Sequence, residues 1–368
     1  MYSEAITQAK PHTQKKFELI TNYVDGWARK ILGYQKSKGV IYIDCMSNSG
    51  KYYDDDNKII DGTAISVASK LNDIIKDYPG KKAIIFYNDK DKIRIEVLRN
   101  FLNDPKFNNL EIHFSVDDAN EFLKKLDIRE YCDYNTLMIY DPYDASIDWD
   151  AITPFLNTWG EVIINHMISD TIRAARVAQK QSTIKKYEQT YQSDIQKIID
   201  SCDMKKLDEA IQNIIHNQYD KRRKHFVASI PFYNRKNGLV YNLIHCSSNI
   251  NGLILYKKIA WKTFGGKSSL INTHDKEKQL CFNFDNLSIQ GNKVKNCYFV
   301  EDIADYVYIK YHDKGKVSLS EIYADLDRHP IFPSEGFKQQ IKKSLKEKYN
   351  AKCPKGKNNI IFDNKDLK

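Results

Sequence analysis

The sequence lacks the features that would assign it to several common classes of protein. No stretch approaches the roughly 18 uncharged apolar residues that a membrane span requires. Residues 1–16 lack the apolar segment of a secretory signal. The seven cysteines form no CxxC pair, which argues against a disulfide framework and against a metal site. We therefore expect a cytoplasmic protein without a bound metal or a membrane partner.

The motifs of several enzyme classes are also missing. The chain has no recognisable nucleophilic triad and no phosphate-binding loop, so the hydrolase and nucleotide triphosphatase classes are disfavoured. What it has is 368 residues, of which 42% are hydrophobic and 29% are charged. This length and composition indicate a soluble globular protein with a core domain and an elaboration or second domain.

Positive charge is concentrated near the C-terminus. The formal net charge is +9, and the last 35 residues contain ten lysines against four carboxylates. Clustered lysines release condensed counterions from nucleic acid, so this region predicts binding to DNA or RNA. The predicted nucleic-acid-binding residues are Lys342, Lys343, Lys346 and Lys348. A solvated basic surface that maintains solubility is the alternative.

Short apolar runs alternate with helical periods between residues 39 and 166, which is the pattern of a parallel sheet built from βαβ units. An amphipathic helix is predicted over residues 14–32, ahead of the first strand. The predicted fold class is therefore α/β with a Rossmann-like sheet. The strands are predicted at residues 40–44, 82–88, 110–115, 135–141 and 161–167.

An insertion and a hairpin follow the parallel strands. Residues 170–220 predict a helical insertion, and two apolar runs, 226–233 and 239–248, flank the turn residues NRKNG. The sheet of methyltransferases that use S-adenosylmethionine (SAM) receives its last strand antiparallel, so the hairpin favours that class over an ordinary dinucleotide-binding domain. We assign residues 1–265 to a methyltransferase-like domain with this insertion.

The remaining residues, 266–368, predict a second domain. Glycine and serine in GGKSS mark its boundary. Strands are expected near residues 279–284 and 294–300, followed by small helices, a lysine-rich stretch and the final strand KNNIIFD. This order predicts a basic, winged-helix-like domain.

The turn after the first strand is a candidate cofactor loop. Asp44 ends the strand, and the small residues Ser47 and Gly50 would let backbone amides approach a ligand. Asn48 adopts a left-handed backbone more readily than most residues. The generic glycine fingerprint is degraded, so spacing alone is a weak signal. We predict that these four residues contact SAM.

Acidic residues also follow the second and third strands. Asp89 is placed to accept the ribose hydroxyls of an adenosine, and Asp118 to meet the adenine amino group. Ligands of open α/β sheets bind outside the carboxyl ends of the strands, so these acids and Asp44 predict one crevice. Each acid taken alone is equally well explained as a helix cap or a solvated turn.

The fourth strand leads into the candidate catalytic motif Asp141-Pro142-Tyr143-Asp144. In amino-methyltransferases, a short acidic or amide residue, a proline and an aromatic at this place grip a planar nitrogen. The polar group accepts the N–H, and the ring stacks on the base. We predict this role for Asp141, Pro142 and Tyr143. The usual second proline is absent, and a strand-ending turn is the alternative.

These motifs together resemble the three-Cys-motif partner (TcmP) family of bacterial and phage proteins. The matching residues are His12-Thr13 with Lys15, the segment 42–53, Asp61-Gly62-Thr63, the DPYD motif, residues 163–167 and Trp261. The family pattern D-x-F-A-G-x-G-x-Y matches at Asp44, Gly50 and Tyr52 and departs at Met46, Ser47 and Asn48. The resemblance implies a methyltransferase-like protein found beside a radical-SAM-like partner with a three-cysteine motif, often in mobile-element or defence contexts.

Two functions fit these motifs. The first is a SAM-dependent methyltransferase that acts on nucleic acid at an exocyclic base nitrogen, with the base flipped outward from a duplex. The second is a non-catalytic nucleic-acid-binding or adaptor protein that has kept the fold and lost the chemistry. Asn48 and the incomplete acceptor motif favour the second. Binding of another adenosine-containing ligand is a third option.

Overall fold

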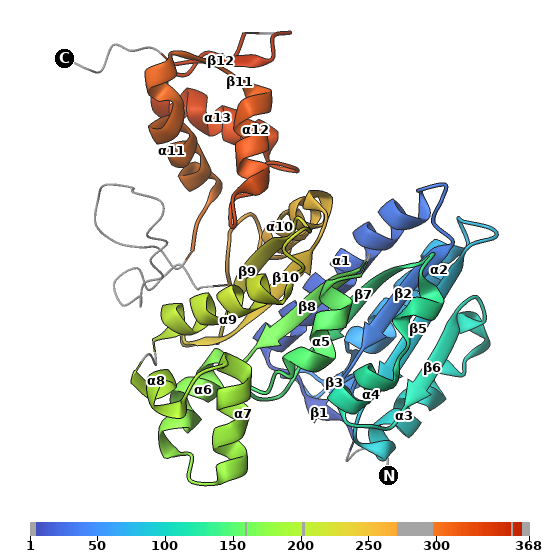
Figure 1. The fold of residues 1–368 in the computed structure, drawn as a ribbon. Helices are drawn as coiled ribbons and strands as arrows, with labels where there is room; N and C mark the ends of the chain where they lie inside the picture. The colour runs from blue at the N-terminus through green and yellow to red at the C-terminus, as the bar shows by residue number, and fades with distance from the viewer. Residues whose placement is uncertain (1–4, 159, 201–202, 271–296, 355, 363–368) are drawn as a thin grey trace.

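A seven-stranded sheet forms the centre of the chain in the computed structural model (Figure 1), which describes residues 5–158, 160–200, 203–270, 297–354 and 356–362. The strand order is β6-β5-β2-β7-β8-β10-β9, and β10 runs antiparallel to both of its neighbours. The predicted α/β class, the five parallel strands and the hairpin are confirmed. The strands are β2 (Gly39–Asp44), β5 (Lys82–Asn88), β6 (Glu111–Ser115), β7 (Asn135–Tyr140), β8 (Glu161–His166), β9 (Phe226–Tyr233) and β10 (Leu239–Ser247).

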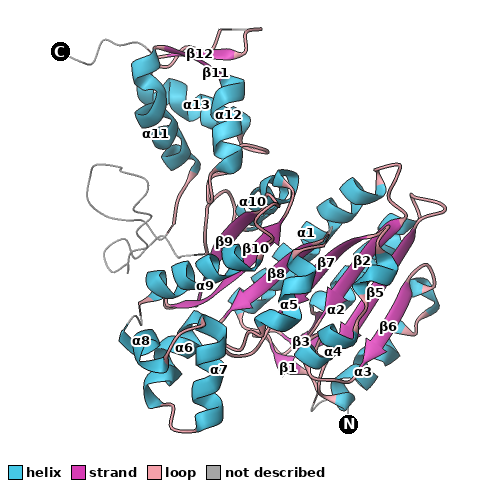
Figure 2. Cartoon of the chain, in the orientation of Figure 1, coloured by secondary structure: helices cyan, strands magenta, loops and turns pink. Residues whose placement is uncertain are grey.

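Helices cover both faces of this sheet (Figure 2). All six residues of β2 are buried, and its side chains enter two cores in alternation, with Ile41 and Ile43 in one and Val40 and Tyr42 in the other. One face packs on α1 (Pro11–Leu32), α2 (Thr63–Ile75), α3 (Lys92–Leu102) and α10 (Ile250–Thr263). The other packs on α4 (Ala119–Lys125), α5 (Trp149–Leu156) and the insertion.

The predicted helical insertion lies between β8 and β9, close to the carboxyl end of β8 (Figure 1). It packs into the sheet's core through Tyr187 and Tyr191, and the indole nitrogen of Trp149 donates to the carbonyl of Thr190 at 2.9 Å. Its position is therefore set by buried contacts. Its helices are α6 (Ile168–Ala174), α7 (Gln181–Tyr191), α8 (Ile195–Asp200) and α9 (Met204–Gln218).

A small second sheet forms directly after the predicted cofactor loop. Its strands are β1 (Thr7–Gln8), β3 (Lys51–Tyr53) and β4 (Ile59–Asp61), in the order β1-β3-β4. These strands of two or three residues show no apolar alternation that the sequence could reveal. They tie the N-terminal segment to the loop after β2.

The C-terminal region forms a separate small core of three helices and a strand pair. Its elements are α11 (Val300–Tyr311), β11 (Lys316–Ser318), α12 (Leu319–Arg328), α13 (Lys338–Tyr349) and β12 (Asn359–Ile361). The predicted final strand is confirmed as β12, which pairs with β11 and bridges to Lys352. The strand expected over 279–284 lies outside the described residues, and Val300 begins α11 instead of ending a strand.

Helix α10 fixes this region to the sheet domain. The ammonium group of Lys257 is fully buried and lies 2.6–3.0 Å from the carbonyl oxygens of Leu326, Asp327, His329 and Phe332, which share its three N–H donors. These carbonyls lie at and beyond the C-terminal end of α12, where a cation is favourable. Trp261, also on α10, is buried in the C-terminal core. The two regions are therefore joined by specific buried contacts.

Short 3-10 helices at Pro105–Phe107, Ile128–Tyr131, Ala175–Val177 and His312–Lys314 complete the described elements. Among the helices of the described residues, none combines the length and the apolar character that crossing a membrane would take.

Candidate active site

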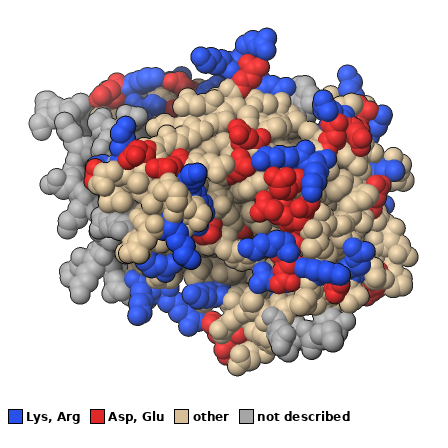
Figure 3. All heavy atoms as spheres, turned by 60° about the horizontal axis from the view of Figure 1, so that its bottom comes forward, with Lys and Arg blue, Asp and Glu red and all other residues tan. Residues whose placement is uncertain are grey.

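Three carboxylates gather at the carboxyl edge of the sheet. Asp44 ends β2, Asp89 follows β5, and Asp141 follows β7, and β2 pairs with both of the other strands. Asp44 and Asp89 are buried, and the face in Figure 3 shows other acidic side chains near its centre with lysine and arginine side chains beside them. The strand order therefore brings Asp44 close to Asp141, although 97 positions separate them in the sequence.

Asp44 is the most perturbed of these acids. Its side chain is buried, and its carboxylate accepts from the backbone N–H of Met46 at 3.3 Å and from the hydroxyl of Tyr42 at 3.4 Å. Burial, followed by the negative charges of Asp141 and Asp89, raises its pKa to about 7, against the opposing effects of the Met46 N–H and Lys16. A nearby cation would therefore stabilise the ionised form.

The loop after β2 folds back on itself. Asn48 has a φ of 57° and accepts the N–H of Ser49 on its own side-chain oxygen at 2.6 Å. The N–H of Asn48 donates to Asp89 at 3.0 Å, and the N–H of Ser47 donates to the carbonyl of Asn88 at 2.8 Å. The predicted loop residues are thus close together, but these three amides already have partners within the protein.

Gly50 is required by the packing of this loop. Its φ is +73°, which favours glycine. A Cβ atom there would lie 2.6 Å from a methyl carbon of Leu98 and 2.9 Å from Ile65. The glycine that the sequence marked as a cofactor contact therefore has a structural reason of its own.

Asp89 is almost fully buried and organises two turns. One oxygen accepts the N–H of Asn48 at 3.0 Å, and the other accepts the N–H of Asp91 at 2.9 Å. The carboxylate thus ties the loop after β2 to the start of α3. Its predicted role as the ribose acceptor would use the lone pairs that these two bonds leave.

Asp118 is exposed and lies one strand further along the edge. It caps α4 by accepting the N–H of Asn120 at 2.9 Å, so the helix-cap explanation accounts for it fully.

Asn88 joins the loop after β2 to the loop after β6, and its side chain is fully buried. Its side chain donates to the carbonyls of Cys45 and Asp117, both at 3.0 Å. The sequence did not predict these two hydrogen bonds, because nothing in the local sequence distinguishes Asn88 from an ordinary turn residue.

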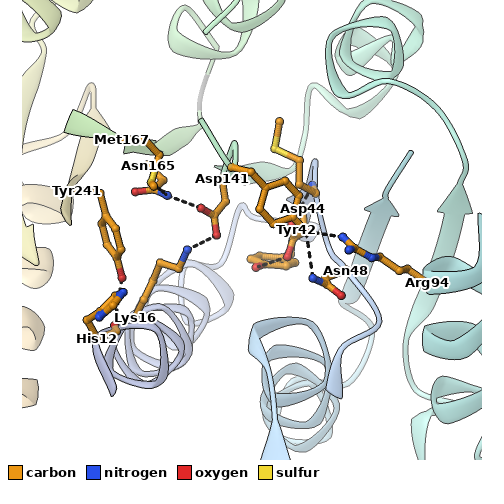
Figure 4. Close-up of polar contacts among 12 residues, drawn as sticks. His12, Lys16, Tyr42, Asp44, Asn48, Arg94, Asp141, Asn165, Met167 and Tyr241 are labelled. Atoms are coloured by element: carbon orange, nitrogen blue, oxygen red, sulfur yellow. Dashed lines mark hydrogen bonds and ion pairs between the residues drawn. The ribbon is translucent and has the colours of Figure 1, made fainter. Parts of the chain in front are cut away.

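Asp141 is held from two sides (Figure 4). The ammonium group of Lys16 forms an ion pair with one oxygen, and the side-chain nitrogen of Asn165 donates to the other at 2.6 Å. The side-chain oxygen of Asn165 is buried and has no hydrogen-bond partner within the described part of the chain. The motif therefore presents a carboxylate of fixed orientation, as a group that accepts an N–H must.

The hydroxyl of Tyr143 contacts the loop after β2 and helix α3. This hydroxyl accepts from the side-chain nitrogen of Asn48 at 3.0 Å and from the guanidinium of Arg94 at 2.7 Å. The residue as a whole is 58% exposed. Burial of the hydroxyl raises its pKa to about 12, so the phenol stays protonated. In this conformation, Tyr143 contacts the loop after β2, whereas the sequence predicted that it would stack on an acceptor base.

Helix α1 contributes a charged residue that sequence reasoning did not single out. Lys16 is 7% exposed, and its ammonium lies 5.2 Å from the ring centre of Tyr241. It shares the buried face of α1 with Ile20 and Tyr23, at the helical spacing of four and seven residues. A lysine on an apolar helix face was the signal available in the sequence.

His166 does not belong to this site. It adjoins Asn165 on β8, but successive strand residues point to opposite faces. Its ring contacts the hydroxyl of Tyr191 in the insertion at 2.8 Å, and burial lowers its pKa to about 3. We therefore treat it as a packing residue.

The carboxylates fit a cationic adenosine compound such as SAM in one respect. Among the described residues, no lysine or arginine forms an ion pair with Asp44 or Asp89, so a positively charged ligand would relieve their repulsion. The misfit is Asn48, because its side chain closes the loop at the place where the resembled family has glycine.

The predicted basic residues lie far along the chain, on α13. Lys342, Lys343 and Lys346 line a hollow beside this helix. Lys348 pairs with Asp305 of α11 instead. The structure thus groups three of the four lysines and separates the fourth.

Comparisons with known proteins give distant likenesses, and no family model matches the chain. Ribonuclease M5 of Mycoplasma capricolum is 25% identical over 131 residues, which are 33% of this chain and 71% of that protein. A Legionella pneumophila protein of known structure covers 63% of this chain and 85% of its own, with 10% identity and a TM-score of 0.37. An rRNA methylase of Streptococcus thermophilus covers 60% and 93%, with 11% identity and a TM-score of 0.31.

Proposed function

We propose that this chain is a SAM-dependent methyltransferase that acts on nucleic acid at an exocyclic base nitrogen. One observation carries the proposal: β10 runs antiparallel between β8 and β9 in a sheet that is otherwise parallel. Methyltransferase sheets have this arrangement, whereas an ordinary dinucleotide-binding sheet does not. The carboxylates lie at the edge of the sheet where ligands of such folds bind.

Different residues of the chain would contact the methionine, ribose and adenine parts of the cofactor. SAM would supply an electrophilic methyl group on a sulfonium ion. Asp44, with Ser47, Asn48 and Gly50, would contact the methionine end, and Asp89 would accept the ribose hydroxyls. Asp118 would reach the adenine amino group if it left its cap on α4.

The acceptor would be held by Asp141. Because Lys16 and Asn165 fix both of its oxygens, the carboxylate can accept an N–H of an amino group without reorienting. Pro142 is buried and sets the turn, and Tyr143 would cover the cofactor or stack on the base after leaving Asn48. Positioning of this kind supplies most of the rate in such transfers. The ribonuclease likeness and the lysines of α13 favour nucleic acid as the target.

A second candidate has its own supporting observation. The side chain of Asn48 caps Ser49 and holds Tyr143, so the loop is satisfied without a ligand. A non-catalytic nucleic-acid-binding or adaptor protein would show this. In the resembled family, such a chain would work beside a radical-SAM-like three-Cys-motif protein.

Titration calorimetry with SAM separates the two candidates. The methyltransferase proposal predicts a binding heat that Asp44→Ala abolishes, and the adaptor proposal predicts none. Asn48→Gly should tighten SAM binding about tenfold, because it removes the side chain that closes the loop while glycine accepts the left-handed backbone. Asn57→Gly is the matched control, because Asn57 has nearly the same φ, 59°, in the exposed turn between β3 and β4.

Mass spectrometry of nucleosides tests the target. Nucleic acid from cells with the gene should contain a methylated amino-base nucleoside that cells without the gene lack. Asp141→Asn should reduce its amount. A methylated base with the methyl group on a ring nitrogen or carbon would contradict the assigned acceptor.

A further inference from the structure

Helix α13 has two chemically different faces. Phe337, Ile341 and Leu345, spaced by four residues, are buried in the C-terminal core. The opposite face carries amide and ammonium groups, and its residues are Gln339, Gln340, Lys342, Lys343 and Lys346. Such a face offers many hydrogen-bond donors and little negative charge.

A groove runs along this polar face. On one side, a hollow of about 680 Å³ separates α13 from the chain around Cys353, Pro354 and Gly356. On the other side, a hollow of about 510 Å³ lies near the N-terminal turn of the helix. Gln339 and Lys343 line both hollows, and Glu347 is the carboxylate among their described lining residues.

The chain after α13 folds into a hairpin beside the groove. The backbone of Lys352 exchanges hydrogen bonds with Ile361 at 2.8 and 2.9 Å, and β12 pairs on its other side with β11. The connecting segment brings Lys357 to the groove. The order of helix, strand, helix, helix and hairpin is that of a winged helix-turn-helix.

We propose that this groove is a reader of double-stranded DNA, with α13 in the major groove and the hairpin segment against the backbone. This inference rests on the proposed function, in which the target is nucleic acid, and it specifies that the nucleic acid is double-stranded DNA. Gln339 and Gln340 are suited to base edges, because a glutamine amide can pair with adenine. Lysine side chains are suited to phosphates, and those that line the groove include Lys342, Lys343, Lys346 and Lys357.

The shape of the surface favours DNA over RNA. The major groove of B-form DNA admits an α-helix, whereas that of an A-form RNA duplex is too deep and narrow. The described lining of the groove contains no aromatic side chain on which an unpaired base could stack. A helix that presents amides and ammonium groups therefore matches a duplex of B form.

The test is fluorescence anisotropy of the full chain with three labelled probes: a mixed-sequence DNA duplex of about two helical turns, the RNA duplex of the same sequence, and the single DNA strand. The DNA duplex should bind about tenfold more tightly than either alternative. The double variant Lys343→Gln/Lys346→Gln should lose about tenfold in affinity and reduce the salt slope by about two.

Lys348→Gln is the control, because it removes one positive charge from the same helix, as each substitution of the double variant does, at a residue that pairs with Asp305 and is not among the described lining residues of the groove. It should leave affinity and slope close to those of the unaltered chain. Equal affinity for the DNA duplex and either other probe would overturn the proposal. So would a double variant that binds like the control.

Selection from a random DNA duplex library tests the reading of sequence. Gln339→Ala should flatten the preference at one or two positions of the enriched site, whereas Lys343→Gln/Lys346→Gln should weaken all sequences alike. A library without an enriched sequence would contradict base reading. SAM calorimetry is independent of these results, so loss of the methyltransferase proposal and loss of the DNA reader are distinguishable.

Discussion

The protonation state of Asp44 is coupled to the stability of the fold. Its pKa is raised to about 7 from the ordinary value of 3.8, first by burial and then by Asp141 and Asp89. Between these pH values, the folded chain holds a proton that the unfolded chain has lost. The contribution of Asp44 to stability therefore falls as the pH rises through this window.

Asp44→Asn should remove this dependence. We expect the variant to be more stable than the unaltered chain by about 2 kcal/mol at about pH 8 and nearly equal to it at about pH 4. Urea unfolding at the two pH values measures the difference. Asp73→Asn, at an exposed position of α2, is the control and should show no such change. A stability difference for Asp44→Asn that is the same at both pH values would contradict the assignment.

Lys16 and Asp141 form a second testable unit at this scale. Lys16→Met should destabilise the fold by about 2 kcal/mol, because it leaves a partly buried carboxylate without its cation. Adding Asp141→Asn should restore most of this loss. A double-mutant cycle by urea unfolding would then give a coupling of about 1–2 kcal/mol. Strictly additive effects would show that the ion pair does not hold Asp141.

Among the secondary-structure elements, those with strong periodicity were predictable. The strands β2, β5 and β7 each contain a continuous apolar run between polar or glycine ends, because helices cover both faces of the sheet, and this run is visible in the sequence. The strands β1, β3 and β4 are too short to leave a pattern. Helix α10 lies inside the predicted domain of residues 1–265 but was not predicted as a helix, because its side chains are buried in two different cores and it therefore lacks a single apolar face.

The site was predictable only in part, for a different physical reason. The positions of Asp44, Asp89 and Asp141 follow from the rule that parallel strands present their carboxyl ends at one edge. Their partners do not follow from any local rule. Lys16 reaches Asp141 across 125 residues, and Asn88 joins two loops through its amide. Long-range contacts of single polar side chains are set by packing, which one sequence does not display.

Helix α10 provides a prediction at the level of elements. Lys257→Met would leave four carbonyls at the end of α12 without their shared donor, so we expect the C-terminal core to lose several kcal/mol, about 3 or more. Hydrogen exchange should increase in α11, α12 and α13 more than in β2 and β7. Lys258→Met is the control, because its ammonium pairs with Glu335 near the surface and should cost less than about 1 kcal/mol. If Lys257→Met changed hydrogen exchange equally in the C-terminal helices and in the sheet, the claim that α10 holds the C-terminal region in place would be wrong.

At the scale of the whole molecule, negative and positive side chains gather in different regions. The edge of the sheet gathers carboxylates, which suit a cationic cofactor, and the outer face of α13 gathers lysines, which suit a polyanion. Since α10 joins the two regions through Lys257 and Trp261, a duplex bound at α13 would lie at a set distance from the carboxyl edge of the sheet. Removal of residues 334–368 would also strip Phe337 and Ile341 from the core around Trp261, so single substitutions on α13 give the cleaner test.

The most direct measurement is a crystal structure grown with S-adenosylhomocysteine, the product form of the cofactor. We predict the ligand at the carboxyl edge between the loops that follow β2 and β5, with its ribose at Asp89 and with Tyr143 released from Asn48. A structure at saturating ligand in which the side chain of Asn48 still holds Tyr143, with no adenosine density beside Asp44 and Asp89, would contradict the account.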